Sequence, residues 1–464
     1  MRVTNNITTR QFLRNNRRAL TSMLQSHNRI MTQRRFNRVS EDSINGSKAM
    51  SIRRQLRDLD IYADNLSSSK AVFASAESDL YSIAHDSYIK LEEKLVAATN
   101  GTYEQMELNI FAVDLENIAE HMVETLNGDF SERQLFGGTS NDPTPFRIEQ
   151  AVVKNGAGEV VYPPDYNKYY NADGTLKDGV NKTDIPKSVI YNGIPINFDV
   201  TSDVILPDGT ISKLESGDYT VSFLNNDGTW EDKTFEIDTA KAIAENNNAL
   251  AFPGSKPIYV DIGLGIKYNE NYEVDPQTAL DVSMNGAEIT NSGIDMSDVK
   301  KVPKMEQVFD PVTGAPVLDT EGNPTYREVK DAEGNTVYEA AKDEKGNVKL
   351  DNLFSKNLVQ LVLDSAAALR DGSQDIANAI IDRANEANNY ILTQITTLGT
   401  KQNSIEFYLN KNEDYKFNLK ERQNVVEGTD MEDEITQYEA IQAAYDASLK
   451  LGSNILPHSI FDFI

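Results

Sequence analysis

Residues 51–80 read SIRRQLRDLDIYADNLSSSKAVFASAESDL, and the spacing of their apolar residues decides the fold. Apolar residues recur at intervals of three and four positions through this stretch and beyond it, at Ile52, Leu56, Leu59, Ala63, Leu66, Phe73, Leu80, Ala84 and Leu91. That spacing is typical of a helix that pairs along a coiled-coil seam. Lys70 and Glu77 interrupt the stripe, which favours a bundle over a free two-stranded coil. We therefore predict a helix over 45–98, capped by Ser40 or Asp42 and about 80 Å long.

A second helix is predicted over 104–127, after a turn at Asn100-Gly101. Its apolar stripe comprises Phe111, Leu115, Ile118, Met122 and Leu126. Because the connection is short, the two helices are expected to be antiparallel neighbours.

The C-terminal part of the chain, from about residue 351, repeats this pattern. Its apolar positions are Phe354, Leu358, Leu361, Ala368, Ile376, Ile380, Ala384, Ala387, Ile391, Leu398, Ile405 and Leu409, and a last helix from about 430 carries Ile435, Tyr438, Tyr445 and Leu449. Amphipathic segments of this kind need a partner surface to be stable. We expect the two chain ends to pack on each other, with two independent coiled coils as the alternative.

The middle of the chain, from about 141 to 350, has a different composition. Of the fifteen prolines, all but Pro457 lie between 143 and 324. Hairpin turns are indicated at 173–175, 208–210 and 227–229, and an Asp-x-x-Gly-Asn repeat begins at Asp319, Asp331 and Asp343. The segments between the repeats are short and charged, so we expect them to form an exposed ribbon or to stay mobile. The predicted fold class is α+β: a long antiparallel helical bundle built from both chain ends, with a β-rich central insert.

Charge is distributed unevenly along the 464 residues. Residues 1–60 hold thirteen Lys and Arg against four Asp and Glu, whereas the whole chain has a net charge of −27. The acidic balance argues against nucleic acid as the main partner, although the basic N-terminus alone is a candidate phosphate-binding arm. No apolar run approaches the length of a membrane span, and residues 1–30 lack the apolar core of a secretory signal peptide.

Features that indicate catalysis are weak. The chain has no cysteine and four histidines, none in a metal-ligand spacing, so we predict no catalytic, cofactor-binding or metal-binding residues and no cofactor. Gly263-Leu264-Gly265 lacks the third glycine of a phosphate loop and is predicted to be a glycine-punctuated strand. Trp230 follows a turn and is predicted to lie in a strand. The expectation is that the protein is not an enzyme.

Several stretches resemble the flagellin superfamily of axial filament proteins. The start Met1-Arg2-Val3-Thr4-Asn5-Asn6 is similar, and residues 35–49, RFNRVSEDSINGSKA, resemble the family's N-x-P-S-D-D-P-x-x-A segment. This chain departs from that segment in carrying Val39 and Ser43 in place of the two prolines and Glu41 in place of an aspartate. The similarity continues through Arg53-Arg54-Gln55-Leu56, Asn65, Ala76-Glu77 and residues 98–102, ATNGT.

Within the superfamily, three features resemble the hook–filament junction branch, hook-associated protein 3, more than flagellin itself. Residues 135–146, LFGGTSNDPTPF, are similar to that branch's exit from the second helix. Residues 260–266, VDIGLGI, with 276–287 resemble its return strand and linker. Residues 452–464, GSNILPHSIFDFI, are similar to its C-terminus. Flagellin is the alternative within the superfamily.

The resemblance implies a structural role in the bacterial flagellum. It implies export through the flagellar type III channel, with the help of an export chaperone, to an extracellular location. The implied assembly partners are hook-associated protein 1, flagellin and further copies of the chain in a ring. Binding to nucleic acid and insertion into a membrane are not expected. It further implies two assembly segments at the chain ends: residues 1–44, partly disordered in the monomer, and a helix at 430–464. The two halves of the helical bundle would be 45–140 and 351–429. Between them, 141–350 would form a variable β-rich outer domain, in which 253–290 is the return strand and linker. A secreted adhesin-like module with a helical stalk, binding a ligand through 147–350, is the alternative outside the superfamily.

The two chain ends are the predicted subunit–subunit surface, because amphipathic helices without a completed partner order when a neighbour supplies one. The candidate residues are Phe12, Leu13, Leu20, Met23, Leu24, Ile30, Ile435, Tyr438, Tyr445, Leu449, Ile455, Leu456, Phe461 and Phe463. The simpler interpretation is that both ends complete their own bundle.

Overall fold

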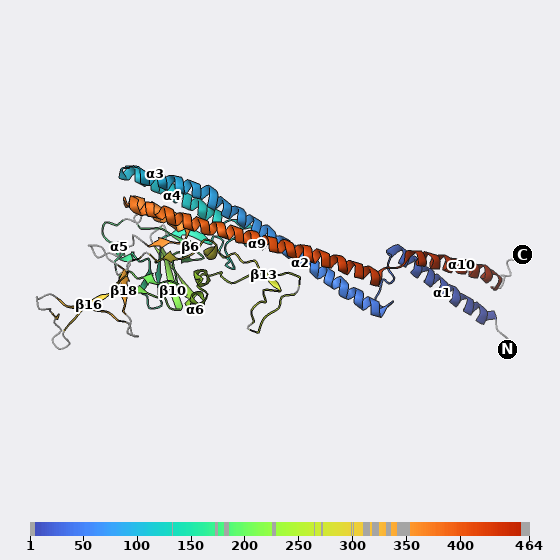
Figure 1. Cartoon of the computed structure of the whole chain (residues 1–464). Coiled ribbons are helices and arrows are strands. Elements are labelled where there is room, and N and C mark those ends of the chain that lie inside the picture. The colour runs from blue at the N-terminus through green and yellow to red at the C-terminus, as the bar shows by residue number, and fades with distance from the viewer. Residues whose placement is uncertain are drawn as a thin grey trace. The chain divides into compact units, whose positions relative to one another are not determined.

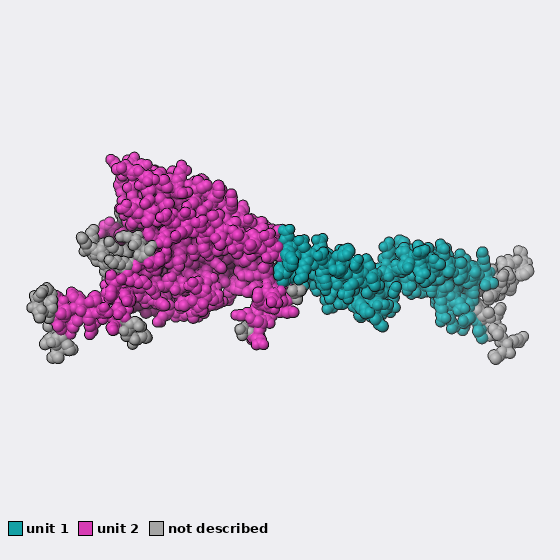
Figure 2. Space-filling model, viewed as in Figure 1, with its two compact units in different colours: residues 1–66, 262–264, 406–464 teal, residues 67–261, 265–405 magenta. Residues whose placement is uncertain are grey.

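The computed structural model describes residues 5–131, 133–171, 175–180, 185–224, 229–263, 265–270, 272–297, 299, 301–309, 316–317, 324–330, 336–340 and 353–455. The chain forms two compact units (Figure 2). Unit 1 comprises 1–66, 262–264 and 406–464, and unit 2 comprises 67–261 and 265–405. Both chain ends therefore belong to one unit.

Unit 1 is helical. Its elements are α1 (Asn5–Thr32), the first part of α2 (Ser43–Tyr81), the last part of α9 (Gln374–Glu427) and α10 (Met431–Ile455). In Figure 1, α1 lies alongside α10. The buried side chains of Ile52, Leu59 and Leu419 join the α2 and α9 parts. The prediction that the two chain ends pack on each other is confirmed.

The predicted 45–98 helix is present without a break in helical structure, with a π-helical turn inside it. α2 passes into the π turn η1 (Ser82–Ser87) and then into α3 (Tyr88–Asn100). Ile83 and Ala84 are adjacent and both buried. The extra residue of a π turn shifts the buried stripe by one position, which keeps the later seam residues facing the bundle. The predicted a/d spacing missed this turn because it ran from Leu80 directly to Ala84.

Unit 2 contains a helical layer of α3, α4 (Gln105–Leu126), α8 (Leu358–Arg370) and the first part of α9. A capping box between Glu104 and Glu107 begins α4, close to the predicted start. α8 packs on α4 and is buried on nearly all sides, as expected of a helix whose surface is apolar all round. Gln374 of α9 donates to the Ala98 carbonyl at 3.0 Å, and Gln402 donates to Glu77 at 2.6 Å, so α9 runs antiparallel to α2 and α3.

The C-terminal pattern predicted as one run is broken after α8. Asp371, Gly372 and Ser373 separate α8 from α9, and Gly372 has a φ of +73°. Glycine adopts this left-handed conformation without a steric penalty, so it ends α8 and lets the chain turn into α9.

The β-rich region of unit 2 consists of short antiparallel strands, as predicted. The strands are β1 (Asp129–Phe130), β2 (Arg133–Gln134), β3 (Phe146–Glu149), β4 (Ala151–Lys154), β5 (Val160–Tyr162), β6 (Ser188–Tyr191), β7 (Ile194–Pro195), β8 (Val204–Ile205), β9 (Ile211–Ser212), β10 (Gly217–Leu224), β11 (Trp230–Ile237), β12 (Tyr259–Asp261), β13 (Ala279–Asp281), β14 (Ile294–Asp295), β15 (Lys301–Pro303), β16 (Met305–Gln307), β17 (Tyr326–Glu328), β18 (Tyr338–Ala340) and β19 (Phe354–Ser355). In the described part of the chain the larger sheets have the orders β11-β10-β4-β5 and β3-β6-β7. Short helices α5 (Tyr166–Tyr169), α6 (Thr239–Glu245) and α7 (Gly286–Ile289) and the 3₁₀ turn η3 (Asn248–Ala251) lie between strands.

The hairpin predictions have different outcomes. The turn at 208–210 joins β8 to β9 as predicted, with Gly209 at φ +89°. β10 pairs with β11, and Trp230 begins β11, so the prediction that Trp230 lies in a strand is confirmed. The predicted turn residues 227–228 and 173–174 lie outside the described residues, as do the tips of the Asp-x-x-Gly-Asn repeat. The repeat's flanking segments pair as exposed ribbons, β15 with β18 and β16 with β17.

The predicted strand at Gly263–Gly265 is wrong. β12 ends at Asp261, and Gly263 and Gly265 have φ values of +102° and +73°, outside the strand region. A Cβ at Gly263 would lie 2.5 Å from Oδ1 of Asn412, which leaves room only for glycine at this crossing of α9.

Candidate assembly surface

α1 and α10 form an antiparallel helical hairpin, called here the terminal hairpin. Its buried and half-buried seam positions alternate in steps of four and three: Phe12, Asn16, Ala19, Met23, Ser26 and Ile30 on α1, and Glu434, Tyr438, Ile441, Tyr445, Ser448 and Gly452 on α10. This is the a/d pattern of a coiled coil. The sequence therefore pairs the two helices through residues more than 400 positions apart.

Contacts along the seam set the register of the terminal hairpin. The Phe12 ring lies over Gly452, where any side chain would overlap it. Ser448 donates to Oδ1 of Asn16 at 3.2 Å. At the other end, the carboxylate of Glu434 is buried and accepts from Oγ of Ser26 at 2.7 Å. Burying polar groups at a seam ties them to one register, because a slip would leave them unpaired.

A buried carboxylate also holds the junction between the hairpin and the longer helices. The Glu427 side chain is 4% exposed and lies 2.6 Å from Nη2 of Arg53 and 3.7 Å from Nε of Arg34. The backbone N–H of Arg35 donates to the Glu427 carbonyl at 2.7 Å, and that of Thr429 donates to the Gln33 carbonyl. The turn after α1 and the turn after α9 are thereby fastened together.

The segment that resembles the family motif forms the start of α2. Asp42 caps α2, since its Oδ1 accepts from the Asn45 N–H at 3.0 Å, and the hydrogen bonds from Asn45 lower the pKa of Asp42. Asp42 was one of the two predicted caps. A Cβ at Gly46 would lie 3.1 Å from the backbone of Val39, so the turn closes tightly against this glycine.

An apolar stripe runs along one side of the terminal hairpin. Its members are exposed, from 37% for Leu20 to 71% for Met31: Leu13, Leu20, Leu24, Met31, Ile435 and Leu449. Each lies one position after a seam residue on its helix. In an antiparallel pair, positions that follow the seam on both helices point to the same side. The stripe is therefore one surface shared by α1 and α10.

The predicted interface residues divide between seam and stripe. Phe12, Met23, Ile30, Tyr438 and Tyr445 are half-buried in the seam. Leu13, Leu20, Leu24, Ile435 and Leu449 belong to the exposed stripe. Ile455 ends α10, and Leu456, Phe461 and Phe463 lie outside the described residues. The ends complete a hairpin of their own and still present apolar surface.

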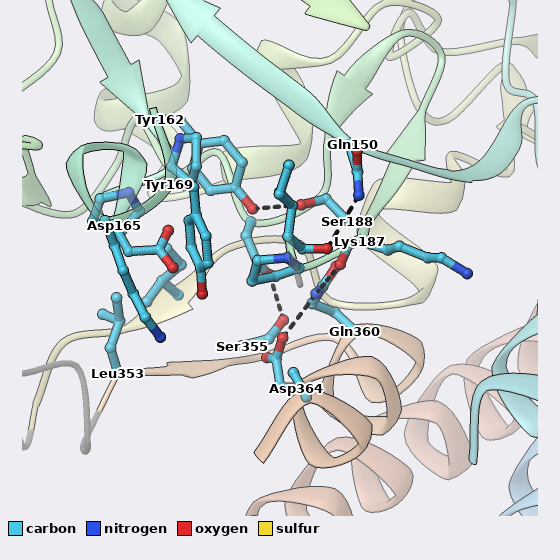
Figure 3. A pocket seen from close by; sticks show the side chains of 18 of the residues that line it. Gln150, Tyr162, Asp165, Tyr169, Lys187, Ser188, Leu353, Ser355, Gln360 and Asp364 are labelled. Carbon is cyan, nitrogen blue, oxygen red and sulfur yellow. Dashed lines mark hydrogen bonds between the residues drawn. The ribbon is translucent and has the colours of Figure 1, made fainter. Parts of the chain in front are cut away.

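Sequence reasoning missed a cavity of about 560 Å³ in unit 2. In Figure 3, Asp364 and Gln360 of α8 lie on one side of it, and Tyr162, Asp165 and Tyr169 line another. These residues are far apart in the sequence and carry no recognisable motif. Only the tertiary fold, in which α8 packs against β6, brings them together.

The polar groups of this cavity bond mainly to one another. Gln360 donates to Oδ1 of Asp364 at 2.8 Å and to the Lys187 carbonyl at 3.3 Å, and its own carbonyl accepts from the Val189 N–H at 2.7 Å. Burial, with a smaller contribution from the negative charge of nearby Asp165, raises the pKa of Asp364 to about 7. Gln360 thus ties α8 to β6, which gives this cluster a structural role.

Comparison with models of known protein families gives a match to the N-terminal part of the chain. The model of the bacterial flagellin N-terminal helical region matches residues 3–141. Residues 3–141 are therefore similar to the flagellin N-terminal helical region, in agreement with the family resemblance of the sequence. A comparison with curated proteins gave no match.

Several solved structures are similar to the chain at low identity. A putative flagellar hook-associated protein from Vibrio parahaemolyticus is 11% identical over 83% of this chain and 99% of its own, with a TM-score of 0.41. FlgL from Xanthomonas campestris is 14% identical over 76% and 93%, with a TM-score of 0.34. The flagellar junction protein FlgL from Legionella pneumophila is 12% identical over 83% and 100%, with a TM-score of 0.31.

Proposed function

We propose that this chain, with its flagellin N-terminal helical region, is a structural subunit of the bacterial flagellum that joins the hook to the filament. Its assembly surface is the apolar stripe of the terminal hairpin. Its neighbours in the flagellum would be hook-associated protein 1 on the hook side and flagellin on the filament side, with further copies of the chain between them.

The observation that carries the proposal is the exposed stripe on a hairpin made from both chain ends. Six large apolar side chains on one side of α1 and α10 are exposed to water, which solvates them poorly. Such patches on soluble proteins mark surfaces that another protein covers. Burial of apolar area contributes about 25 cal/mol per Å², so covering the stripe favours assembly.

The exit from α4 supports the junction branch over flagellin. Phe136 of the LFGGT stretch is fully buried, and its carbonyl accepts from the Tyr191 hydroxyl and the Gly286 N–H, each at 2.9 Å. Gly138 has a φ of +62°, and a Cβ there would overlap the Gly254 carbonyl. This stretch, which resembles the junction branch, fastens the exit from α4 to β6, to α7 and to the turn at Gly254.

Export through the flagellar type III channel with a chaperone, and an extracellular location, belong to the same proposal. In the described residues, no helix combines the length and the apolar character needed to cross a membrane.

Electron microscopy of hook fragments carrying hook-associated protein 1, incubated with the purified chain, tests the proposal. We expect a thin, self-limiting layer on the hook tip, with light scattering that reaches a plateau. Long filaments would identify a flagellin instead. No association with the hook would reject both and favour an adhesin-like module.

A further inference from the structure

The cavity of unit 2 has the dimensions of a small-molecule site. Its volume of about 560 Å³ lies in the range of pockets that hold organic ligands. Tyr162 and Tyr169, both buried, form part of its wall (Figure 3). Ala367 of α8 and Ile380 of α9 add aliphatic surface. The cavity therefore offers apolar walls to a ligand of several carbon atoms.

The charged residues that line this cavity are mainly acidic. They are Asp165, Asp208, Asp364, Asp371, Lys168 and Lys187. Both lysines have an acidic partner. Nζ of Lys168 lies 3.4 Å from Asp371. Nζ of Lys187 lies 3.8 Å from Glu116 of α4. The lining therefore has an excess of negative charge.

Two of the four aspartates have no paired cation in the described part of the chain. Asp208 lies 3.0 Å from Nζ of Lys304, whereas no ion pair between described residues includes Asp165 or Asp364. Gln360 donates to Oδ1 of Asp364 at 2.8 Å, and Oδ2 of Asp364 accepts no hydrogen bond from a described residue. Two half-buried carboxylates thus line the cavity without a charge partner.

These two carboxylates face the same space. In Figure 3 the side chains of Asp165 and Asp364 point into the cavity from different sides. Burial raises the pKa of Asp364, and it raises the pKa of Asp165 although the nearby Lys168 ammonium acts in the opposite direction. In each case the surroundings stabilise the charged form too little. A positively charged ligand would supply the missing stabilisation.

We propose that the cavity of unit 2 binds an organic amine, with its ammonium group at Asp165 and Asp364 and its carbon skeleton against the apolar walls. Hydrogen bonds from an ammonium to a carboxylate are stronger than those between neutral groups. Tyrosine rings add attraction, because their faces are electron-rich. The site belongs to unit 2 and does not depend on the assembly surface in unit 1.

Isothermal titration calorimetry of the full chain with cyclohexylamine tests the proposal, and cyclohexanol is the uncharged probe of matching shape. We expect the amine to bind with one-to-one stoichiometry and the alcohol to bind about tenfold more weakly, because the alcohol cannot form the charge-assisted hydrogen bonds. Equal affinities would overturn the proposal, since the cavity would then recognise shape and not charge. Absence of binding by the amine, or competition of calcium chloride for the same site, would overturn it as well.

Asp364→Asn and Asp165→Asn test which groups hold the ammonium. Each variant keeps the size of the side chain, removes its charge and should weaken cyclohexylamine binding about tenfold, with little change for cyclohexanol. Asp232→Asn, at an exposed site on β11, removes the same charge and should bind like the wild type. Wild-type affinity in both cavity variants would place the amine elsewhere and overturn the proposal. Melting curves identify a variant that does not fold, and the comparison of amine with alcohol in the wild type then decides.

The pH dependence of binding gives an independent test. Free Asp364 holds a proton below its pKa of about 7, and the ammonium requires the carboxylate, so wild-type affinity for cyclohexylamine should rise between pH 5.5 and pH 8. An alkylammonium keeps its charge over this range. Tyr162, Tyr169 and Lys168 have raised pKa values and keep their protons as well. The rise should be smaller in Asp364→Asn, and a wild-type affinity that does not change with pH would contradict the role of Asp364.

Discussion

Ser26 on α1 donates its hydroxyl hydrogen to the carboxylate of Glu434 on α10 over 2.7 Å, although 408 positions separate them in the chain. Glu434 is nearly buried and has a second partner in Arg29 at 3.7 Å. This polar contact, inside an otherwise mostly apolar seam, ties the two ends of the protein to one register. The surface proposed for assembly depends on that register.

Replacing Ser26 with alanine should therefore weaken the terminal hairpin. The change removes one hydrogen bond and leaves a buried carboxylate less satisfied, at a cost of about 1–2 kcal/mol. Hydrogen exchange of α1 amides measures the effect, and exchange in α4 should not change. Ser22→Ala, at an exposed position of the same helix, is the control. Equal exchange in both variants would contradict the structural role of Ser26.

Arg53→Met should destabilise unit 1 by removing the closest partner of Glu427. We expect a loss of about 2 kcal/mol, below the cost at a fully buried pair because Arg53 is 40% exposed. Urea denaturation followed by circular dichroism measures it. Arg54→Met, next in sequence but exposed, should leave the unfolding midpoint unchanged. A similar loss of stability in both variants would show that the ion pair between Glu427 and Arg53 does not account for the effect.

The stability of unit 2 should depend on pH through Asp364. Its folded-state pKa, about 7, lies above the ordinary value of 3.8, so the folded protein holds a proton that the unfolded chain releases. The stabilisation from Asp364 is complete below pH 3.8 and is lost as pH rises through 7. Asp364→Asn keeps the acceptor for Gln360 and should flatten this part of the profile.

Thermal unfolding at pH 5, 6, 7 and 8 compares wild type with Asp364→Asn. The melting temperature of the variant should rise relative to that of the wild type as pH rises, because only the wild type must ionise a half-buried carboxyl. A constant difference between the two proteins across this range would show that Asp364 does not titrate there.

Residues 1–44 and 430–464 should exchange amide hydrogens faster than α4 and α8 in the monomer. A two-helix hairpin has little core of its own, whereas α8 is surrounded by other elements. Binding to hook fragments should slow exchange in α1 and α10 selectively. Equal protection in the free monomer would contradict the expectation that these ends are partly disordered before assembly.

Sequence periodicity predicted the helices well because their seams repeat every three or four residues. The pairing of α1 with α10 followed from the need of each amphipathic end for a partner. Periodicity could not reveal the π turn at Ser82–Ser87, since a single extra residue looks like an irregular step between Leu80 and Ala84. Periodicity also could not reveal the break between α8 and α9 at Gly372, because apolar positions at helical spacing continue on both sides of it.

The candidate site was only partly predictable from the sequence. Apolar spacing identified residues of the stripe such as Leu20 and Leu24, but it did not separate them from seam residues such as Met23. That distinction depends on which face meets α10. The Glu427–Arg53 pair and the Asp364–Gln360 cluster depend on tertiary packing, because no local pattern links residues so far apart.

The central claim is that the apolar stripe of the terminal hairpin is the surface through which this chain assembles on the hook. Leu20→Asp/Leu24→Asp places charge on the stripe, and Ile243→Asp/Met305→Asp does so at similarly exposed sites of unit 2. Electron microscopy of hook fragments incubated with each variant is the most direct test. The account predicts a layer on the hook tip with the wild type and the unit 2 variant and none with the stripe variant. A normal layer from the stripe variant would contradict it.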